Sequence, residues 1–540
     1  MFCASPHRNG HPVIIKENLV AHSVHPSDLT CRYREIYRNK SLEEPDKAYM
    51  KGRNRRLSFG KPLSKEFLLV KCASKQYPKS SFHEQFLLNP IVKKRSEEGL
   101  RKKIRQTPHN LSVLILGVDS VSNLNLHRQF PYTARLMREE LRAFELHGYN
   151  KVGLNTLPNL YPLLMGLTNS EVTEAAPDGF YDPLISRFIA SKYGKRGYTT
   201  MHLEESSSFG LFAYEGRGFR RAPADYYLRP VIQAMEQYSR LGSFGVPCLG
   251  PTMPFEELLD YLRRFLQTIG QRPFFAFAWV NDITHNNLNN AGYADAPVHH
   301  LLQSLRESGV LSRTLLVFLS DHGIRFGDIR ETYLGKLEDR QPFAFLAFPA
   351  WFLGAHPEAA RSLRVNQRRL TTPFDIHATL VELLEYPRLE RPNTTYGLSL
   401  LHEVPDTRTC ADASISRAWC TCSIQVDDYV SETLALSMAD YMVLIINDEL
   451  RKTPECSQYT LLDVLDVTTL QQTTAEREGN VNHYWVTVKL SPGGAVFEGT
   501  VQVRGDSVTN VTALTRVSWF SDTSTCSSYA KDFCFCRTKR

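Results

Sequence analysis

The 540-residue sequence has no long hydrophobic run. A membrane-spanning helix requires roughly 20 consecutive apolar residues. The longest apolar runs here lie at residues 273–280, 314–319 and 441–446, and they have the length of buried strands. The first 20 residues also lack the sustained apolar segment of a secretory signal peptide. The sequence therefore predicts no transmembrane segment.

The sequence also has little excess charge. Its 64 basic and 57 acidic residues leave a formal charge of +7, which is too dilute over 540 residues to indicate a nucleic-acid-binding protein. The most basic segment, residues 93–106, carries Glu97 and Glu98 among its cations, as is typical of a solvated helix or linker. Zinc-finger and RNA-recognition patterns are missing, and we expect no nucleic-acid partner.

Cysteine, in contrast, is abundant and clustered. Seven of the 11 cysteines follow residue 405, and they include the two C-x-C pairs Cys420/Cys422 and Cys534/Cys536. One intervening residue suits two separate disulfides better than a tetrahedral zinc site. Four N-x-S/T sequons occur, at Asn39, Asn110, Asn393 and Asn510. These features favour an extracellular or secretory-lumen protein. The missing signal segment and the odd cysteine count then suggest an incomplete N-terminus.

Sequence patterns divide the chain into three regions. Residues 1–110 are polar and poorly periodic, and they predict a partly irregular lumenal segment with a strand that ends at Cys72. In residues 111–404, apolar strand-like runs alternate with amphipathic stretches, which predicts an α/β core with a mainly parallel sheet and helices on both faces. Residues 405–540 predict a smaller β-rich module held by disulfides.

Polar residues collect where three of the core strands end. Asp119 follows the first strand, Asp282 and His285 follow the second, and Asp321 and His322 follow the third. In an open α/β sheet, ligands bind beyond the carboxyl ends of the strands. We therefore expect a site at this edge, with carboxylates and imidazoles available as metal ligands or as acid–base groups.

Thr156 is placed at the start of a predicted helix. Pro158 follows within the first turn, where its missing N–H costs nothing. Helix capping alone accounts for a threonine at this position. However, a helix N-terminus also attracts anions and stabilises a developing alkoxide. Beside a cation held by Asp119 and Asp321, the Thr156 hydroxyl would be an activated nucleophile for attack on a phosphoryl or sulfuryl centre.

Three motifs in this order, "GVDS", T-x-P-N before a helix and "SDHG", resemble the sulfatase-like branch of the alkaline-phosphatase superfamily. Within that branch the chain resembles an animal family of extracellular sulfatase-like proteins that is defined as a domain of unknown function. The similar stretches are "ELHGYNKVGLNTLPNLYPLLMG", "SDHGIRFGDIRETYLGKLEDRQPF" and "RAWCTC". The resemblance covers residues 30–540, and it centres on residues 110–390.

The resemblance implies a role for each matching residue. Asp119, Asp321 and His322, together with Thr156, match the metal ligands, and Thr156 also matches the nucleophile. His285 matches a histidine that binds substrate or donates a proton. Lys336 resembles an anion-binding lysine, although a lysine on an exposed loop would simply be solvated.

The sequence departs from true sulfatases at the nucleophile. Sulfatases carry C-x-P-x-R, whose cysteine becomes formylglycine, whereas this chain has Thr156 in "TLPNL". A threonine nucleophile instead resembles phosphodiesterases and phosphoglycerol or phosphoethanolamine transferases. Asp282 is a candidate ligand for a second metal. However, two-metal phosphodiesterases resemble D-x-x-x-H, and His285 follows Asp282 one residue too early for this pattern. His377 lies within a predicted helix and suits a structural role there. The resemblance therefore implies one firmly bound zinc or manganese ion and leaves a second open.

The leading hypothesis is a metal-dependent phosphoric-ester hydrolase or phosphotransferase that uses Thr156. Its substrate would be a phosphate ester, with lipid and glycan carriers both open. The alternatives are a sulfuric-ester hydrolase and a catalytically silent extracellular binding protein of the same fold. The oligomeric state is not specified by the sequence.

Overall fold

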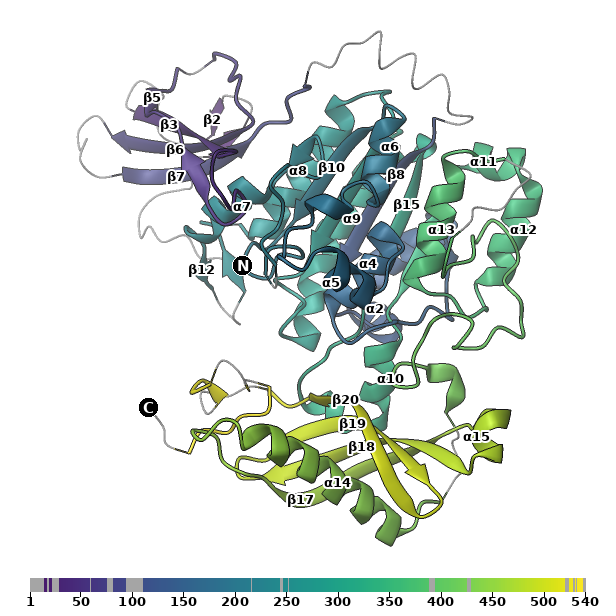
Figure 1. Cartoon of the computed structure of the whole chain (residues 1–540). Helices are drawn as coiled ribbons and strands as arrows, with labels where there is room; N and C mark the ends of the chain where they lie inside the picture. Colours follow the sequence, from purple (N-terminus) through teal and green to yellow (C-terminus); the bar gives the residue numbers. More distant parts are fainter. Residues whose placement is uncertain are drawn as a thin grey trace.

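The computed structural model (Figure 1) describes most of the chain, namely residues 14–16, 19–21, 29–58, 60–74, 81–93, 110–214, 216–242, 246–250, 252–387, 394–424, 429–519, 524–527, 530 and 532–537. Cys3, Asn393 and nearly all of the basic segment 93–106 lie outside these residues. None of the helices in the described residues combines the length and the apolar character needed to cross a membrane.

A seven-stranded sheet forms the centre of the molecule, in the order β11–β10–β14–β8–β15–β16–β9. The first five strands in this order run parallel, and β16 and β9 are antiparallel additions at one edge. The strands are β8 (Ser112–Val118), β9 (Phe144–Glu145), β10 (Thr199–Glu204), β11 (Tyr226–Tyr227), β14 (Phe274–Val280), β15 (Thr314–Leu319) and β16 (Ala344–Ala347). Every residue of β8, β14 and β15 is buried, which explains their continuous apolar sequences.

Helices cover both faces of this sheet, as the sequence predicted (Figure 1). Alternate residues of a strand face opposite sides, so Leu114 and Leu116 of β8 join one core and Val113 and Ile115 join the other. The first face packs against α2 (Asn123–Gln129), α3 (Pro131–Arg135), α7 (Arg229–Glu236), α8 (Pro254–Thr268) and α9 (Gly292–Glu307). The second packs against α4 (Thr156–Met165), α5 (Asn169–Ala175), α6 (Ile189–Lys195), α11 (Ala350–Ala355), α12 (Pro357–Asn366) and α13 (Pro373–Leu383).

An antiparallel sheet precedes the core. The strands are β3 (Leu29–Arg38), β4 (Tyr49–Lys51), β5 (Arg55–Arg56), β6 (Phe67–Ser74) and β7 (Ser81–Leu88). The strand expected to end at Cys72 is β6, and it continues for two more residues. A Cys31–Cys72 disulfide joins β3 to β6. Two short antiparallel pairs of strands also occur before residue 250: β1 (Ile14–Lys16) with β2 (Leu19–Ala21), and β12 (Arg240–Leu241) with β13 (Pro247–Cys248).

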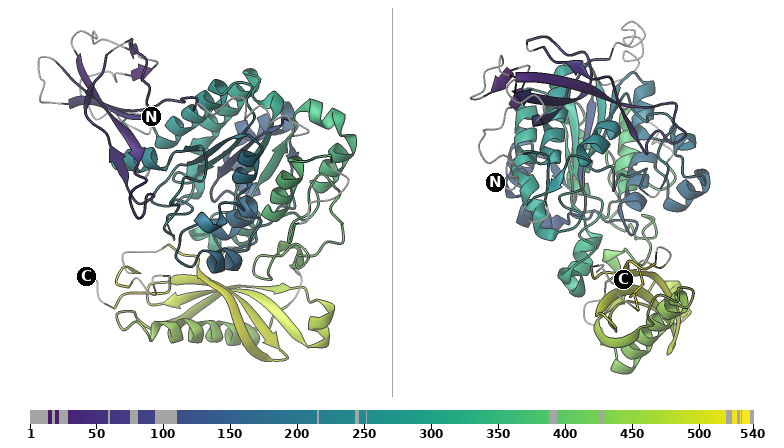
Figure 2. Two further views of the ribbon diagram at one scale, coloured as in Figure 1. Left: turned by 45° about the horizontal axis from the view of Figure 1, so that its top comes forward. Right: turned by 90° about the vertical axis from the view of Figure 1, so that its left-hand side faces the viewer.

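The C-terminal part forms a second antiparallel sheet, which lies at the opposite end of the core from the N-terminal sheet (Figure 2). Its strands follow the chain order: β17 (Thr460–Leu470), β18 (Val481–Ser491), β19 (Ala495–Arg504) and β20 (Ser507–Arg516), with the short helix α15 (Thr474–Glu478) between the first two. The apolar run 441–446 has strand length, but it lies inside helix α14 (Glu432–Leu450). Met438, Met442 and Ile446 recur every fourth residue and pack on this sheet, so the helical period prevails.

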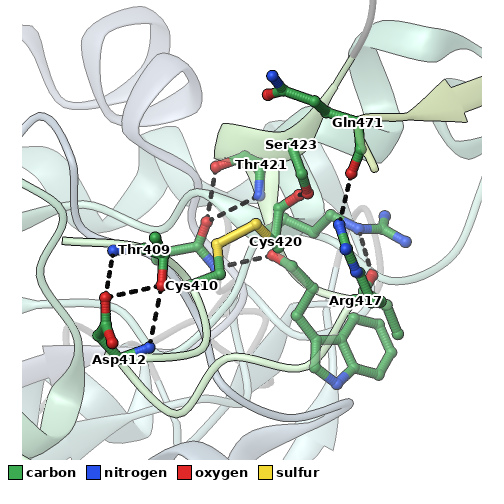
Figure 3. The surroundings of a disulfide bond; sticks show 12 residues. Thr409, Cys410, Asp412, Arg417, Cys420, Thr421, Ser423 and Gln471 are labelled. Atoms are coloured by element: carbon green, nitrogen blue, oxygen red, sulfur yellow. Dashed lines mark hydrogen bonds between the residues drawn. A yellow bond between two sulfur atoms is a disulfide. The ribbon is translucent and has the colours of Figure 1, made fainter. Parts of the chain in front are cut away.

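Four disulfides lie within the described residues: Cys31–Cys72, Cys410–Cys420, Cys456–Cys534 and Cys526–Cys536. The pair Cys534/Cys536 therefore belongs to two separate disulfides, as predicted. In the other pair only Cys420 is bonded, and Cys422 is a free thiol. Figure 3 shows the Cys410–Cys420 bridge beside Thr409, whose backbone N–H donates to Asp412 Oδ2 at 2.9 Å.

Candidate functional site

Two neighbouring strands bring three of the predicted ligands together. Asp119 follows β8, and Asp321 and His322 follow β15, which pairs with β8 in parallel. One ligand atom from each of the three residues lies within 4.8 Å of the others. His322 Nε2 is 3.2 Å from Asp321 Oδ2 and 3.9 Å from Asp119 Oδ1. All three residues are at most 2% exposed, so the group is a buried acidic cluster with one imidazole.

Thr156, the first residue of α4, reaches this group. Its Oγ1 donates to Asp119 Oδ2 at 3.3 Å and lies 3.3 Å from His322 Nε2. Asn159 fixes the preceding loop, because its Oδ1 accepts from the backbone N–H groups of Val152 and Gly153. This contact gives the asparagine of the T-x-P-N motif a positioning role. The helix start therefore directs the hydroxyl at the carboxylates.

The hydrogen bonds of His322 define its tautomer. Its Nδ1–H donates to the carbonyl oxygen of Gly323 at 2.7 Å, which leaves the Nε2 lone pair directed at the carboxylates and Thr156. Burial lowers the pKa of His322 to about 4, and the positive charges of Lys151 and Arg325 add to this shift. His322 is therefore neutral at physiological pH and available as a ligand.

The two carboxylates fit a divalent cation. Ser120 adopts a left-handed backbone (φ 62°), and its N–H donates to Asp321 Oδ1 while its hydroxyl donates to Asp119 Oδ1. The other oxygen of Asp321, Oδ2, is buried and accepts no hydrogen bond from the residues that the structure describes. Burial and the charge of Asp119 raise the pKa of Asp321. Two adjacent buried carboxylates repel each other, and a cation bound between them would remove this cost.

Lys151 lies beside this cluster and was not singled out from the sequence. Its Nζ is completely buried, 2.7 Å from Asp339 Oδ2 and 4.4 Å from the centre of the Trp419 ring. Burial lowers the pKa of Lys151 to about 7, and the charge of Asp339 opposes this effect. A fully buried lysine in the loop before Thr156 has no marked sequence signal, because its partner lies 188 residues away.

A buried ion network extends from Asp339 to the C-terminal sheet. Asp339 belongs to α10 (Tyr333–Arg340), and its Oδ2 is 3.4 Å from Arg330 Nη1. Arg330 and Arg340 both pair with Glu498 of β19, at 3.3 Å and 2.5 Å. The Arg340 guanidinium also lies 3.9 Å from the centre of the Trp485 ring. The C-terminal sheet is therefore in direct contact with the segment that follows the "SDHG" motif.

Lys336 lies on α10 and is fully buried, rather than on an exposed loop. Its Nζ donates to Asp466 of β17, so the structure places it at the junction between the core and the C-terminal sheet. His377 is buried in α13, where its Nδ1–H donates to the Leu163 carbonyl oxygen at 2.9 Å. This contact agrees with the structural role expected for His377.

Asp282 and His285 both follow β14, but neither belongs to the three-ligand group. The His285 ring stacks on Phe209 with 5.2 Å between ring centres, and its Nδ1 contacts Asn286 Oδ1 at 2.7 Å. Burial raises the pKa of Asp282, and the charge of Glu236 adds to this shift. His285, the predicted substrate-binding residue, and Asp282, the predicted ligand of a second metal, thus lie just beyond the end of β14, the strand next to β8.

The carboxyl edge of this mainly parallel sheet thus presents the Asp–Asp–His group together with a helix-terminal threonine. The chain belongs to the family described as "Protein of unknown function (DUF229)", which matches residues 7–465. This assignment confirms the predicted membership of a family that is defined as a domain of unknown function.

Three solved structures are similar to this chain at low sequence identity. The lipoteichoic acid synthase LtaP from Listeria monocytogenes is 15% identical, with 56% of this chain and 81% of that chain covered and a TM-score of 0.36. The phosphonate monoester hydrolase SpPMH from Silicibacter pomeroyi is 12% identical, with 75% and 88% covered and a TM-score of 0.39. An alkaline-phosphatase-superfamily protein from Vibrio parahaemolyticus is 12% identical, with 78% and 92% covered and a TM-score of 0.36. No curated protein matches the sequence.

Proposed function

We propose that the protein is a metal-dependent hydrolase or transferase of phosphate esters, with Thr156 as its nucleophile. One observation carries the proposal: Thr156 Oγ1 lies 3.3 Å from both Asp119 Oδ2 and His322 Nε2. A threonine that only capped its helix would not need contact with two candidate metal ligands. Asp119, Asp321, His322 and Thr156 would hold zinc or manganese, which when bound lowers the hydroxyl pKa and neutralises charge on the phosphoryl oxygens.

The residues of the chain then supply a two-step transfer. Asp119 Oδ2 accepts the hydrogen bond of the Thr156 hydroxyl and so orients the attacking oxygen. The hydroxyl proton passes to solvent water, a Thr156 Oγ1–phosphorus bond forms, and the bond from phosphorus to the ester oxygen breaks. The leaving alcohol takes a proton from His285. Water or an acceptor alcohol next attacks the phosphothreonine and frees Thr156.

The covalent structure supports a location in the extracellular space or the secretory lumen. Four disulfides lie in the described residues, and such bonds persist in oxidising compartments. The sequon residues Asn110 and Asn510 are exposed, so both are accessible to glycosylation. The proposed enzyme is accordingly an extracellular glycoprotein. Lipid-linked and glycan-linked phosphate esters are its proposed substrates.

The test compares Thr156→Val, which removes the hydroxyl at nearly constant volume, with Thr156→Ser, which keeps it. We expect stoichiometric zinc or manganese in the wild type and turnover of an aryl phosphodiester above that of an aryl sulfate. Thr156→Val should lose on the order of a thousand-fold or more in kcat, and Thr156→Ser should retain partial activity. Full activity of Thr156→Val, or faster turnover of the sulfate, contradicts the proposal.

A further inference from the structure

Lys151 joins the loop that leads into Thr156 (residues 146–155, the Thr156 loop) to helix α10. Its backbone N–H donates to the carbonyl oxygen of Arg340 at 3.1 Å. Its ammonium group donates to Asp339 Oδ2 at 2.7 Å and to the carbonyl oxygen of Leu154 at 3.3 Å. Leu154 lies just before the start of α4. Lys151 therefore ties the end of the Thr156 loop to α10 directly in front of the proposed nucleophile.

Helix α10 also holds the loop that carries His322 (residues 320–327, the His322 loop). The carbonyl oxygen of Asp339 accepts the backbone N–H of Gly323 at 3.0 Å, and the carbonyl oxygen of Gly323 accepts His322 Nδ1–H at 2.7 Å. Asp339 thus contacts Lys151 through its carboxylate and the His322 loop through its backbone. Thr156 and His322 are 166 residues apart in the sequence, and their two loops are fastened to the same residue.

Stability alone does not account for an ammonium group at this position. Lys151 is fully buried, and burial lowers its pKa to about 7 although the charge of Asp339 opposes this shift. Asp339 has other cations beside it, because Arg330 Nη1 and Arg340 Nη1 lie 3.4 and 3.7 Å from its Oδ2. An apolar side chain of similar volume is often at least as stabilising as a buried ion pair. It does not, however, supply directed hydrogen bonds to two acceptors in different parts of the chain.

We propose that Lys151 is a positioning residue, which holds the Thr156 loop against α10 and so sets the separation between the Thr156 hydroxyl and His322. This separation is 3.3 Å from Thr156 Oγ1 to His322 Nε2. Lys151 acts on it through Leu154 and Asp339, without touching either group. The catalytic consequence of the proposal rests on the proposed function, whereas the effect on the separation does not.

Crystal structures of the metal-free wild type and of Lys151→Met test this geometry. Methionine has nearly the volume of lysine and packs well on aromatic rings, and the centre of the Trp419 ring lies 4.4 Å from Lys151 Nζ. We expect Lys151→Met to fold and to melt close to the wild-type temperature. The separation of Thr156 Oγ1 from His322 Nε2 should exceed hydrogen-bond distance, about 3.5 Å. If Lys151→Met does not fold, the shorter polar variant Lys151→Gln carries the test with the same expectation.

The matched control is Arg38→Met, which removes another largely buried cation. Arg38 Nε donates to Asp46 Oδ1 at 2.8 Å, and both residues belong to the N-terminal part of the chain. This variant should keep the wild-type separation, whatever its melting temperature. An equal increase in the control would show that the separation follows general stability, and an unchanged separation in Lys151→Met would show that Lys151 does not set it. Either result overturns the proposal.

Metal titration and kinetics separate this proposal from the proposed function. Calorimetry should show that Lys151→Met binds Zn²⁺ roughly 10- to 100-fold more weakly, because His322 and Thr156 no longer converge. In turnover of an aryl phosphodiester, kcat should fall about a hundredfold, as expected when a reacting group is misplaced by about 1 Å. KM should stay unchanged, because the buried Lys151 does not contact the substrate. A raised KM at constant kcat overturns the positioning role. A wild type without turnover contradicts the proposed function, and the crystal structures then decide on Lys151 alone.

Discussion

At the scale of single residues, Gly323 allows the loop that carries His322 to lie close to helix α10. A Cβ at this position would lie 2.1 Å from the Glu338 carbonyl oxygen of α10, and the Gly323 carbonyl accepts the His322 Nδ1–H. We predict that Gly323→Ala displaces His322, lowers metal affinity by roughly 10- to 100-fold and destabilises the fold. Metal titration by calorimetry and thermal melting measure both effects.

The matched control is Gly354→Ala. Gly354 lies in helix α11, and a Cβ there would meet no heavy atom within 4 Å. This substitution should leave metal affinity unchanged and raise stability by up to about 1 kcal/mol, because alanine favours a helix. Unchanged metal affinity in Gly323→Ala would show that the contact with Glu338 does not position His322.

Several candidate residues could be predicted because their positions follow from local sequence. Asp119 and Asp321 directly follow apolar strands, and Thr156 begins a helix, so the topology brings them together. Their catalytic roles stay predictions. Lys151 and Glu498 could not be predicted, because their partners lie 188 and 158 residues away in the sequence. Lys336 was expected to bind a substrate anion from an exposed loop; it is buried, and its Nζ donates to the Asp466 carboxylate.

At the scale of elements, the junction between α10 and β19 depends on Glu498. Burial alone would raise the pKa of Glu498, but the charges of Arg340 and Arg330 outweigh it and lower the pKa from 4.5 to about 2. A lowered carboxyl pKa stabilises the native state above pH 4.5, and this stabilisation is lost as the pH falls toward 2. We predict that the wild type loses on the order of 3 kcal/mol over this range from Glu498.

Urea unfolding between pH 6 and pH 2 measures this contribution. Glu498→Gln should be less stable at pH 6 and should show a smaller loss on acidification, because its side chain does not titrate. Asp506→Asn, on the same sheet but exposed, should keep the wild-type slope. If Glu498→Gln also kept that slope, the ion network would not be responsible for the acid sensitivity.

Helices and strands whose sequence shows one clear pattern of apolar residues could be predicted. Those whose sequence mixes apolar and polar residues without a clear period could not. β8, β14 and β15 are buried on both faces and therefore have continuous apolar sequences. The run 441–446 is equally apolar, but Met438 and Met442 reveal a helix only when a longer window is considered. β3 interleaves arginines with cysteine and tyrosine, so the extent of the N-terminal sheet had no clear signal.

At the scale of the whole molecule, the Cys456–Cys534 disulfide spans 78 residues and encloses all four strands of the C-terminal sheet. Closing such a loop restricts the unfolded chain, and its removal costs about 4 kcal/mol. We predict that the double variant Cys456→Ala/Cys534→Ala loses protease resistance in residues 456–536 before the core does.

Limited proteolysis followed by mass spectrometry locates the first cuts. Cys422→Ala is the control, because this thiol is free, and it should be cleaved like the wild type. First cuts within the core of the double variant would contradict the prediction. They would show that the C-terminal sheet draws its stability from its contacts with α10 and not from the disulfide.

The pairing of β8 with β15 also has a consequence for protein synthesis. Ser120 contacts Asp321 across 201 residues of sequence, and the two loops meet only when β15 joins the sheet. A ribosome translates β8 long before β15, so the growing chain in the meantime carries one open strand edge and only Asp119 of the three-ligand group. Assembly of the Asp119–Asp321–His322 group therefore waits until translation has passed residue 322.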